Sequence, residues 1–209
     1  MKTLLTLFVL LFSSSLLAED ISNLEIEGMS IGDSLLDYFS EKEIKNNIKN
    51  YYSKYNGEFI AVEFWKLSFF EKYESIQITF KKNDNNYKIY GITGAIYFDN
   101  ISDCYDLQNK VSKEISNIFI NAVKNIESGA HSADPSGKSY VNGIFFDYPS
   151  GDYAQVSCYD WSDEHGGDDH LRIGMISNEF FYWLKHGIDN HAISCGSQYI
   201  IFTIFRLVF

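Results

Sequence analysis

The sequence predicts an α+β fold in which helices pack on an antiparallel sheet, and it allows two αβββ units in tandem. Three observations indicate this fold. Several short apolar runs alternate with polar residues, as half-buried strands do. One long stretch carries apolar residues at every third and fourth position, as an amphipathic helix does. The order of helix followed by three strands also occurs twice along the chain.

The first half of the chain is predicted to begin with a short strand at residues 22–28. Two short helices follow at 30–39 and 41–49, because Leu35 and Phe39 in the first, and Ile44 and Ile48 in the second, recur at helical spacing. Three strands are then predicted at residues 58–65, 75–80 and 87–98, with the polar turn 81–86 between the last two.

The second half is predicted to open with the longest helix, at residues 103–127, capped by Ser102 or Asn100. Its apolar stripe consists of Leu107, Val111, Ile115, Ile118, Phe119, Ala122, Val123 and Ile126. A polar loop follows at 129–139. Three strands at 140–148, 152–161 and 170–177 and a closing helix at 178–186 complete the order.

A glycine-rich turn leads into the first predicted helices. Residues 26–36, IEGMSIGDSLL, followed by a second short helix and three strands, resemble the start of small αα-βββ envelope proteins. These are the outer-membrane assembly lipoproteins of the SmpA/OmlA type and the half-domains of β-lactamase inhibitor proteins. The resemblance implies helices on one face of an antiparallel sheet, and a sheet that serves as a protein-binding surface.

The two ends of the chain differ from the middle. Residues 1–18 have a positive start, a short apolar run and a terminal small residue, the pattern of a secretory signal peptide. We therefore expect a periplasmic or secreted protein with no transmembrane span in the mature chain. The predicted organisation is a signal peptide (1–18), a first α+β unit (19–100), a second unit (101–190) and an apolar tail (191–209). The tail is either a buried last strand or a terminus that is not native to the fold.

The charge of the chain limits its partners. With 17 basic and 28 acidic residues, the formal net charge is −11 at pH 7. A phosphate backbone would repel such a chain, so the sequence argues against a nucleic-acid partner.

Three cysteines occur in a chain expected in an oxidising compartment, so one disulfide and one leftover thiol are expected. Cys104 lies three residues before Leu107, on the apolar stripe of the long helix, and Cys158 alternates with Val156 on the inward side of its strand. We predict a Cys104–Cys158 disulfide that stabilises the fold by about 3 to 5 kcal/mol. The third cysteine is Cys195.

An acidic loop between two predicted strands is the most conspicuous cluster of chemistry-bearing residues. Carboxylates suit calcium and imidazoles suit zinc, so the loop is a candidate metal site, with a solvated hairpin tip as the alternative. Its candidate ligands are Asp163, Glu164, His165, Asp168, Asp169 and His170. The remaining histidines, His131, His186 and His191, are expected at the surface. The acids Glu63 and Asp160 have no spacing that would pair them for hydrolysis.

No zinc-protease motif is present in the chain. We therefore expect a non-catalytic protein-binding module with a protein partner in the cell envelope. The alternative is a metal-binding protein or metal-dependent hydrolase that uses the loop 160–170.

Overall fold

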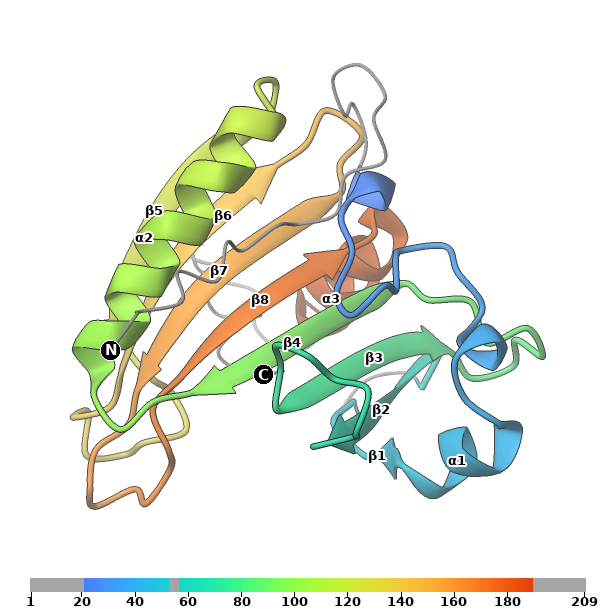
Figure 1. Cartoon of the computed structure of the whole chain (residues 1–209), viewed down its shortest axis with the longest axis horizontal. Coiled ribbons are helices and arrows are strands. Elements are labelled where there is room, and N and C mark those ends of the chain that lie inside the picture. The colour runs from blue at the N-terminus through green and yellow to red at the C-terminus, as the bar shows by residue number, and fades with distance from the viewer. Residues whose placement is uncertain (1–20, 53–56, 190–209) are drawn as a thin grey trace, which may run out of the picture.

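A computed structural model describes residues 21–52 and 57–189 of the 209-residue chain. Eight antiparallel strands form one sheet in the order β1-β2-β3-β4-β8-β7-β6-β5. Figure 1 shows helix α2 in front of this sheet and helix α3 behind it. The structure confirms the predicted α+β fold.

The sheet is assembled from two consecutive groups of four strands. The first group is β1 (Ile48–Lys49), β2 (Phe59–Trp65), β3 (Ser75–Lys81) and β4 (Gly91–Tyr97). The second group is β5 (Val123–Ala130), β6 (Tyr140–Asp147), β7 (Tyr153–Asp160) and β8 (His170–Ile176). The groups join where β4 pairs with β8, from Gly91 opposite Ile176 to Tyr97 opposite His170.

The helices frame the sheet. They are α1 (Glu41–Asn46), α2 (Ile101–Ile118) and α3 (Asn178–Asp189), with the 3-10 turns η1 (Ile21–Asn23) and η2 (Leu35–Asp37). A capping box starts α1, because the Ser40 and Glu43 side chains each accept a hydrogen bond from the other residue's backbone N–H. Asn100 caps α2 by accepting from the N–H of Ser102.

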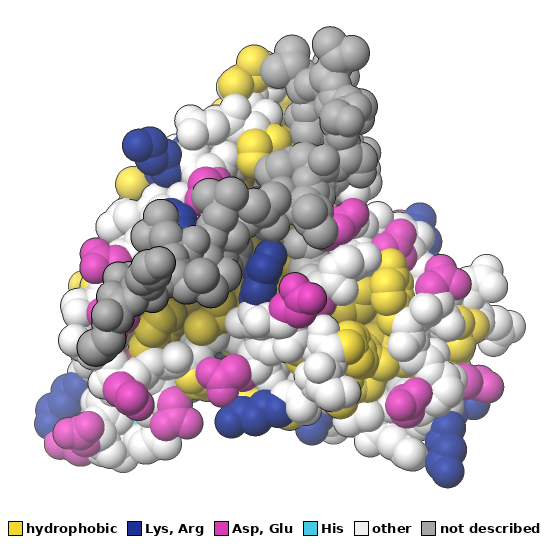
Figure 2. Space-filling view, viewed as in Figure 1, with side chains coloured by type: hydrophobic (Ala, Val, Ile, Leu, Met, Phe, Trp, Pro, Cys, Tyr) yellow, Lys and Arg dark blue, Asp and Glu magenta, His cyan; other side chains and the backbone are white. Residues whose placement is uncertain are grey.

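The larger part of the core lies between α2, the N-terminal segment and one face of the sheet. Strand β3 contributes Ile76, Ile78 and Phe80 to it, and α2 contributes Val111 and Ile115. Because strand side chains alternate between faces, the polar residues between these positions lie on the opposite side of the sheet. On the α2 side, basic side chains are separated from one another by acidic and uncharged ones (Figure 2).

The N-terminal segment differs from its prediction. Residues 22–28 form the turn η1 and a single bridge between Ile26 and Met29, rather than a strand. Between these two residues the chain turns through Glu27 and Gly28, both with positive φ. The strain at Glu27 is offset because its carboxylate accepts three backbone N–H groups, from Glu71, Lys72 and Tyr73. This contact fixes the segment to the β2–β3 connection.

The long helix is shorter than predicted. It ends at Ile118 instead of residue 127, and the last two residues of the predicted apolar stripe, Val123 and Ile126, belong to strand β5. Phe119 leaves the helical region with φ −107° and ψ 74°, and a turn from Phe119 to Ala122 starts β5. Every residue of β5 then pairs with β6, from Val123 opposite Asp147 to Ala130 opposite Tyr140. Residues 123–130 have apolar positions at helical spacing, but their pairing with β6 makes them a strand.

Two further features of the fold bear on the sequence predictions. Cys104 of α2 and Cys158 of β7 are buried and disulfide-bonded, with their Cα atoms 6.0 Å apart, which confirms the predicted pair. No helix within residues 21–52 and 57–189 is long and apolar enough to cross a membrane. The predicted signal peptide, the apolar tail, His191 and Cys195 lie outside the described residues.

Candidate functional site

The side of the sheet that carries α3 holds most of the polar and aromatic residues that could recognise a ligand. We call this side the α3 face. It is formed by Glu63, Trp65, Ser75, Gln77, Thr93, Tyr97, Gln155, Ser157, Tyr159, His170, Arg172 and Gly174 on strands β2, β3, β4, β7 and β8.

A row of hydrogen-bonding side chains crosses the middle of the α3 face. By strand register the row runs through Glu63, Gln77, Thr93 and Gln155, with Gly174 between the last two, and it ends beside the apolar Phe145 of β6. Gly174 gives its neighbours room, since a Cβ there would lie 2.6 Å from Thr93 Oγ1 and 3.3 Å from Gln155 Nε2. The side chains of Thr93 and Gln155 therefore close over the backbone of β8.

From Gln77 to Gln155 the row is buried although it is polar. Gln155 is 0% exposed, and its Oε1 lies 3.5 Å from the Ser157 hydroxyl. Its Nε2 has no hydrogen-bond partner in the described part of the chain. A buried amide that lacks an acceptor costs about 1–3 kcal/mol, so this nitrogen marks a place where a further carbonyl or hydroxyl would be favourable.

A chain of hydrogen bonds fixes the one histidine of the face. His170 Nδ1 donates to the backbone oxygen of Asp168 at 2.7 Å, and its Nε2 accepts from Arg172 Nε at 3.1 Å. Burial, together with the Arg172 charge, lowers the pKa of His170 to about 3. The imidazole is therefore neutral at physiological pH with both nitrogens engaged, and it has no free nitrogen to act as a general base.

Aromatic rings surround this histidine. The Tyr159 ring stacks on the His170 ring, with their centroids 4.7 Å apart. The Arg172 guanidinium lies over the same Tyr159 ring, 5.3 Å from its centroid. Tyr97 lies 5.2 Å from His170, and Trp65 stacks on Tyr97 at 5.7 Å. Trp65 is 48% exposed, so the rings extend from the buried row to the rim of the face. Flat rings with a guanidinium between them are typical of protein-recognition surfaces.

A second rim contact lies on the same edge of the sheet. The Tyr51 hydroxyl donates to Glu63 Oε2 at 2.6 Å, and Tyr51 is 39% exposed. Burial and this hydrogen bond to a carboxylate raise the pKa of Tyr51. The phenol therefore stays protonated and holds Glu63 in place.

The far end of the face is closed by two loops that lock together. Asp134 Oδ2 accepts from the Ser139 hydroxyl at 2.6 Å, the Ser139 N–H at 2.9 Å and the Ser162 hydroxyl at 2.9 Å. These hydrogen bonds, chiefly those from Ser139 and Ser136, hold the pKa of Asp134 well below its usual range. The carboxylate is ionised and surrounded by donors, so it serves to join loop 131–139 to loop 161–169.

The acidic loop does not gather its candidate ligands around one point. Residues 163–168 are exposed, and Glu164 pairs with Lys138. His165 stacks on Trp161 at 4.3 Å, whereas Asp169 accepts from the Trp161 N–H at 2.7 Å. Asp168 contributes its backbone oxygen to His170, which is buried in β8. Among the described residues there is no group of three or more His, Cys, Asp or Glu side chains that could hold a metal ion. The metal site stays a prediction.

Other residues singled out in the sequence are placed as follows. His131 is buried against Trp161, with ring centroids 4.4 Å apart, so its expected surface position was wrong, while His186 is exposed as expected. Glu63 and Asp160 lie on strands four apart and on opposite faces of the sheet, so they form no acid pair. Gln155 and Arg172 belong to no motif, and their only signal in the sequence is a polar residue within an apolar strand.

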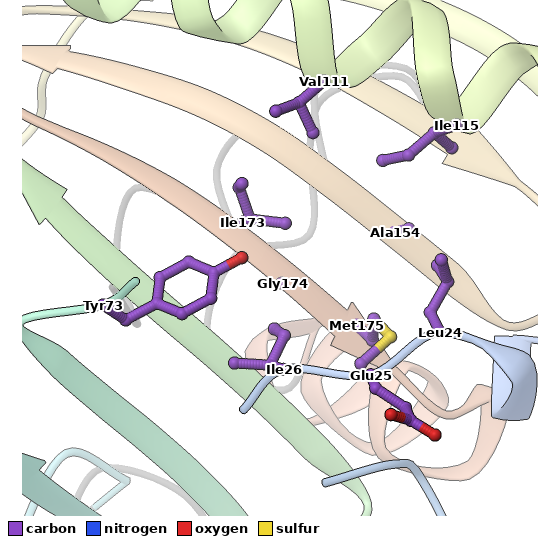
Figure 3. A pocket seen from close by; sticks show the side chains of 10 residues that line it. All are labelled: Leu24, Glu25, Ile26, Tyr73, Val111, Ile115, Ala154, Ile173, Gly174 and Met175. Atoms are coloured by element: carbon purple, nitrogen blue, oxygen red, sulfur yellow. The ribbon is translucent and has the colours of Figure 1, made fainter. Parts of the chain in front are cut away.

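A small apolar cleft lies on the opposite side, between α2 and the N-terminal segment (Figure 3). Leu24, Ile26, Val111 and Ile173 line it, and the Tyr73 hydroxyl points into it. Burial raises the pKa of Tyr73. The Tyr73 ring packs directly on Gly94, where a Cβ would lie only 2.3 Å from the ring.

No protein-family model matches the chain, and no curated protein is similar to it.

Proposed function

We propose that this chain is a non-catalytic protein-binding module of the cell envelope that holds a segment of another protein against its α3 face. The observation that carries the proposal is the buried row of hydrogen-bonding side chains with the orphaned amide of Gln155. A protein segment brings backbone carbonyls, which are the acceptors that such a row lacks.

The partly exposed residues at the edge of the α3 face also support a protein-binding function. Trp65 and Tyr51 are partly exposed at one edge, and Arg172 supplies a cation among aromatic rings. Tryptophan, tyrosine and arginine are the residue types that carry most binding energy at protein interfaces. The neutral, fully bonded His170 and the saturated carboxylate of Asp134 favour a structural role for these groups over a catalytic one.

The proposed location follows from the sequence. Residues 1–18 have the pattern of a signal peptide, so the mature chain would act in the periplasm or outside the cell. A protein partner there is expected, and the net charge of −11 argues against a nucleic-acid partner.

The test is crosslinking of the tagged, full-length protein in its native envelope, followed by mass spectrometry. Trp65→Ala is compared with Tyr140→Ala, because the two residues are 48% and 46% exposed and Tyr140 lies on the α2 side. We expect one reproducible partner whose yield falls at least tenfold in Trp65→Ala and is unchanged in Tyr140→Ala. Equal yields in both variants, or turnover of a substrate that an α3-face substitution abolishes, would contradict the proposal.

A further inference from the structure

Strand β5 forms one edge of the sheet and has no cover on either face. It is the last strand in the sheet order, and β6 is its only partner among the described strands (Figure 1). Helix α2 packs on the neighbouring strands instead, because Gln108 donates to the backbone oxygens of Asn142 in β6 and Val156 in β7. No residue of β5 is buried. The strand therefore lacks the cover that the inner strands have.

Half of the backbone hydrogen-bonding groups of β5 point away from β6. In an antiparallel ladder, alternate residues direct both N–H and C=O to one neighbour, and the residues between them direct theirs to the other side. β5 pairs with β6 at every position from Val123 to Ala130. Apart from this ladder, residues 123–130 form no backbone–backbone hydrogen bond with the described part of the chain. The outer edge can therefore pair with a further strand.

The three most exposed aliphatic side chains of residues 24–52 and 57–186 lie at this edge. Ile126, Ile120 and Val123 are 66%, 63% and 61% exposed. Ile126 lies on the α2 side of the sheet, opposite Ile144, whereas Val123 lies on the other side because strand residues at odd separation point to opposite faces. Apolar side chains thus meet solvent on both sides of β5, which is typical of a protein-contact surface.

The usual protections of an edge strand are missing from β5. Natural edges are kept from pairing by proline, by a bulge or by an outward-pointing lysine. Residues 123–130, VKNIESGA, contain no proline, and their register with β6 has no gap. The one lysine of the strand, Lys124, lies over the Phe146 ring of its own sheet, 5.9 Å from the centroid. The edge is therefore open to pairing.

The sequence of β5 is complementary to itself, which favours a second copy of this chain as the occupant. A two-fold axis normal to the sheet makes two β5 strands antiparallel and keeps each face on its own side. With the axis at Ile126, each charged residue faces an uncharged one. The opposite pairs are Ile126 with Ile126, Asn125 with Glu127, Lys124 with Ser128, and Val123 with Gly129. An axis at Lys124 or Glu127 would instead place like charges opposite each other, which is destabilising.

The charge of the edge also favours self-association there. The chain has a formal net charge of −11, so two copies repel each other as whole molecules. β5 contains one lysine and one glutamate, and these two charges cancel. We infer that two copies of this chain pair through β5, antiparallel and centred on Ile126, and join their sheets into one.

This pairing has a consequence for the α3 face. Because the two-fold axis is normal to the sheet, the α3 faces of both copies lie on the same side of the joined sheet. None of the residues that form the α3 face belongs to β5, so the inference does not depend on the proposed function. A partner with two binding segments would engage both faces at once and bind more tightly than to a single copy.

Sedimentation velocity of the full-length protein, purified from its native host, tests the pairing between about 1 and 100 µM. We expect a wild-type dimer that dissociates on dilution. Ile126→Lys places two lysines opposite each other at the axis and should raise the dissociation constant at least tenfold. Ile48→Lys is the matched control, since Ile48 is an exposed isoleucine of β1 at the other edge of the sheet. It should leave the dissociation constant unchanged.

A mixture of two variants tests the register. Ile126→Glu should also dissociate the dimer, because position 126 faces itself across the axis. When Ile126→Lys and Ile126→Glu are mixed in equal amounts, opposite charges meet at the axis, and we expect the dimer to return. Far-UV circular dichroism checks that each variant is folded, as expected for a side chain that is mostly exposed. A mixture that stays monomeric would overturn the pairing centred on Ile126.

Two other outcomes would also overturn the inference. One is a wild type that stays monomeric up to about 100 µM, and the other is a dimer that Ile126→Lys and Ile48→Lys weaken equally. A monomeric wild type whose crosslinked envelope partner is lost in Ile126→Lys would assign the edge to a strand of another protein. Trp65→Ala should leave the dimer intact, so failure of the proposed function and failure of the pairing are separate results.

Discussion

Replacement of His170 by glutamine is predicted to flatten the dependence of stability on pH. An ordinary histidine in an unfolded chain has a pKa of about 6.5, whereas burial and Arg172 lower the pKa of His170 to about 3. Between these values the unfolded chain binds one more proton than the folded protein. The free energy of unfolding therefore falls as the pH falls through this window, and it is regained as the pH rises.

The magnitude follows from the two pKa values. Between pH 7 and pH 5 the contribution of His170 to the free energy of unfolding falls by about 2 kcal/mol. Urea unfolding of the wild type and of His170→Gln at both pH values measures it, with His165→Gln, an exposed histidine of the preceding loop, as the control. We expect the loss between pH 7 and pH 5 to be about 2 kcal/mol smaller in His170→Gln and unchanged in His165→Gln. An equal loss in all three proteins would refute the assignment of a buried, neutral imidazole.

Three other substitutions follow from the fold. Cys104→Ala with Cys158→Ala opens a disulfide of sequence separation 54, and urea unfolding is expected to give a loss of about 4 kcal/mol; an unchanged free energy of unfolding would contradict this. Gly94→Ala places a Cβ 2.3 Å from the Tyr73 ring, so we expect a loss of about 1–3 kcal/mol that shrinks when Tyr73→Ala is added; equal losses in both backgrounds would contradict this contact. Ser40→Ala removes the capping box of α1 and should lower the free energy of unfolding by about 1 kcal/mol, with no effect counting against a formed cap.

The sequence predicted an element correctly where its local hydrophobic pattern matches the packing of that element in the folded protein. Five strands were predicted within about two residues of their ends, because alternation over β2, β3, β6, β7 and β8 reflects two differently covered faces. The disulfide was predictable for the same reason, since Cys104 and Cys158 each follow the buried side of their element.

Elements that depend on long-range pairing were not predictable. Val123 and Ile126 continue the helical spacing of α2, and only the presence of β6 converts them to a strand. The candidate site was missed because its members are single polar residues on different strands. Gln155 and Arg172 become neighbours of Thr93 and Ala95 only when β8 inserts between β4 and β7, which no spacing along the chain encodes.

The position of β8 has a consequence for how the protein matures. It is the last of the eight described strands along the chain, yet it lies in the middle of the sheet, with β4 on one side and β7 on the other. Until residues 170–176 are synthesised, β4 and β7 each have an unpaired edge, and the two groups of four strands cannot join into one sheet. Completion of the sheet therefore waits until residues 170–176 have been synthesised. During that interval the edges of β4 and β7 are unpaired, and unpaired edges can pair with strands of other chains.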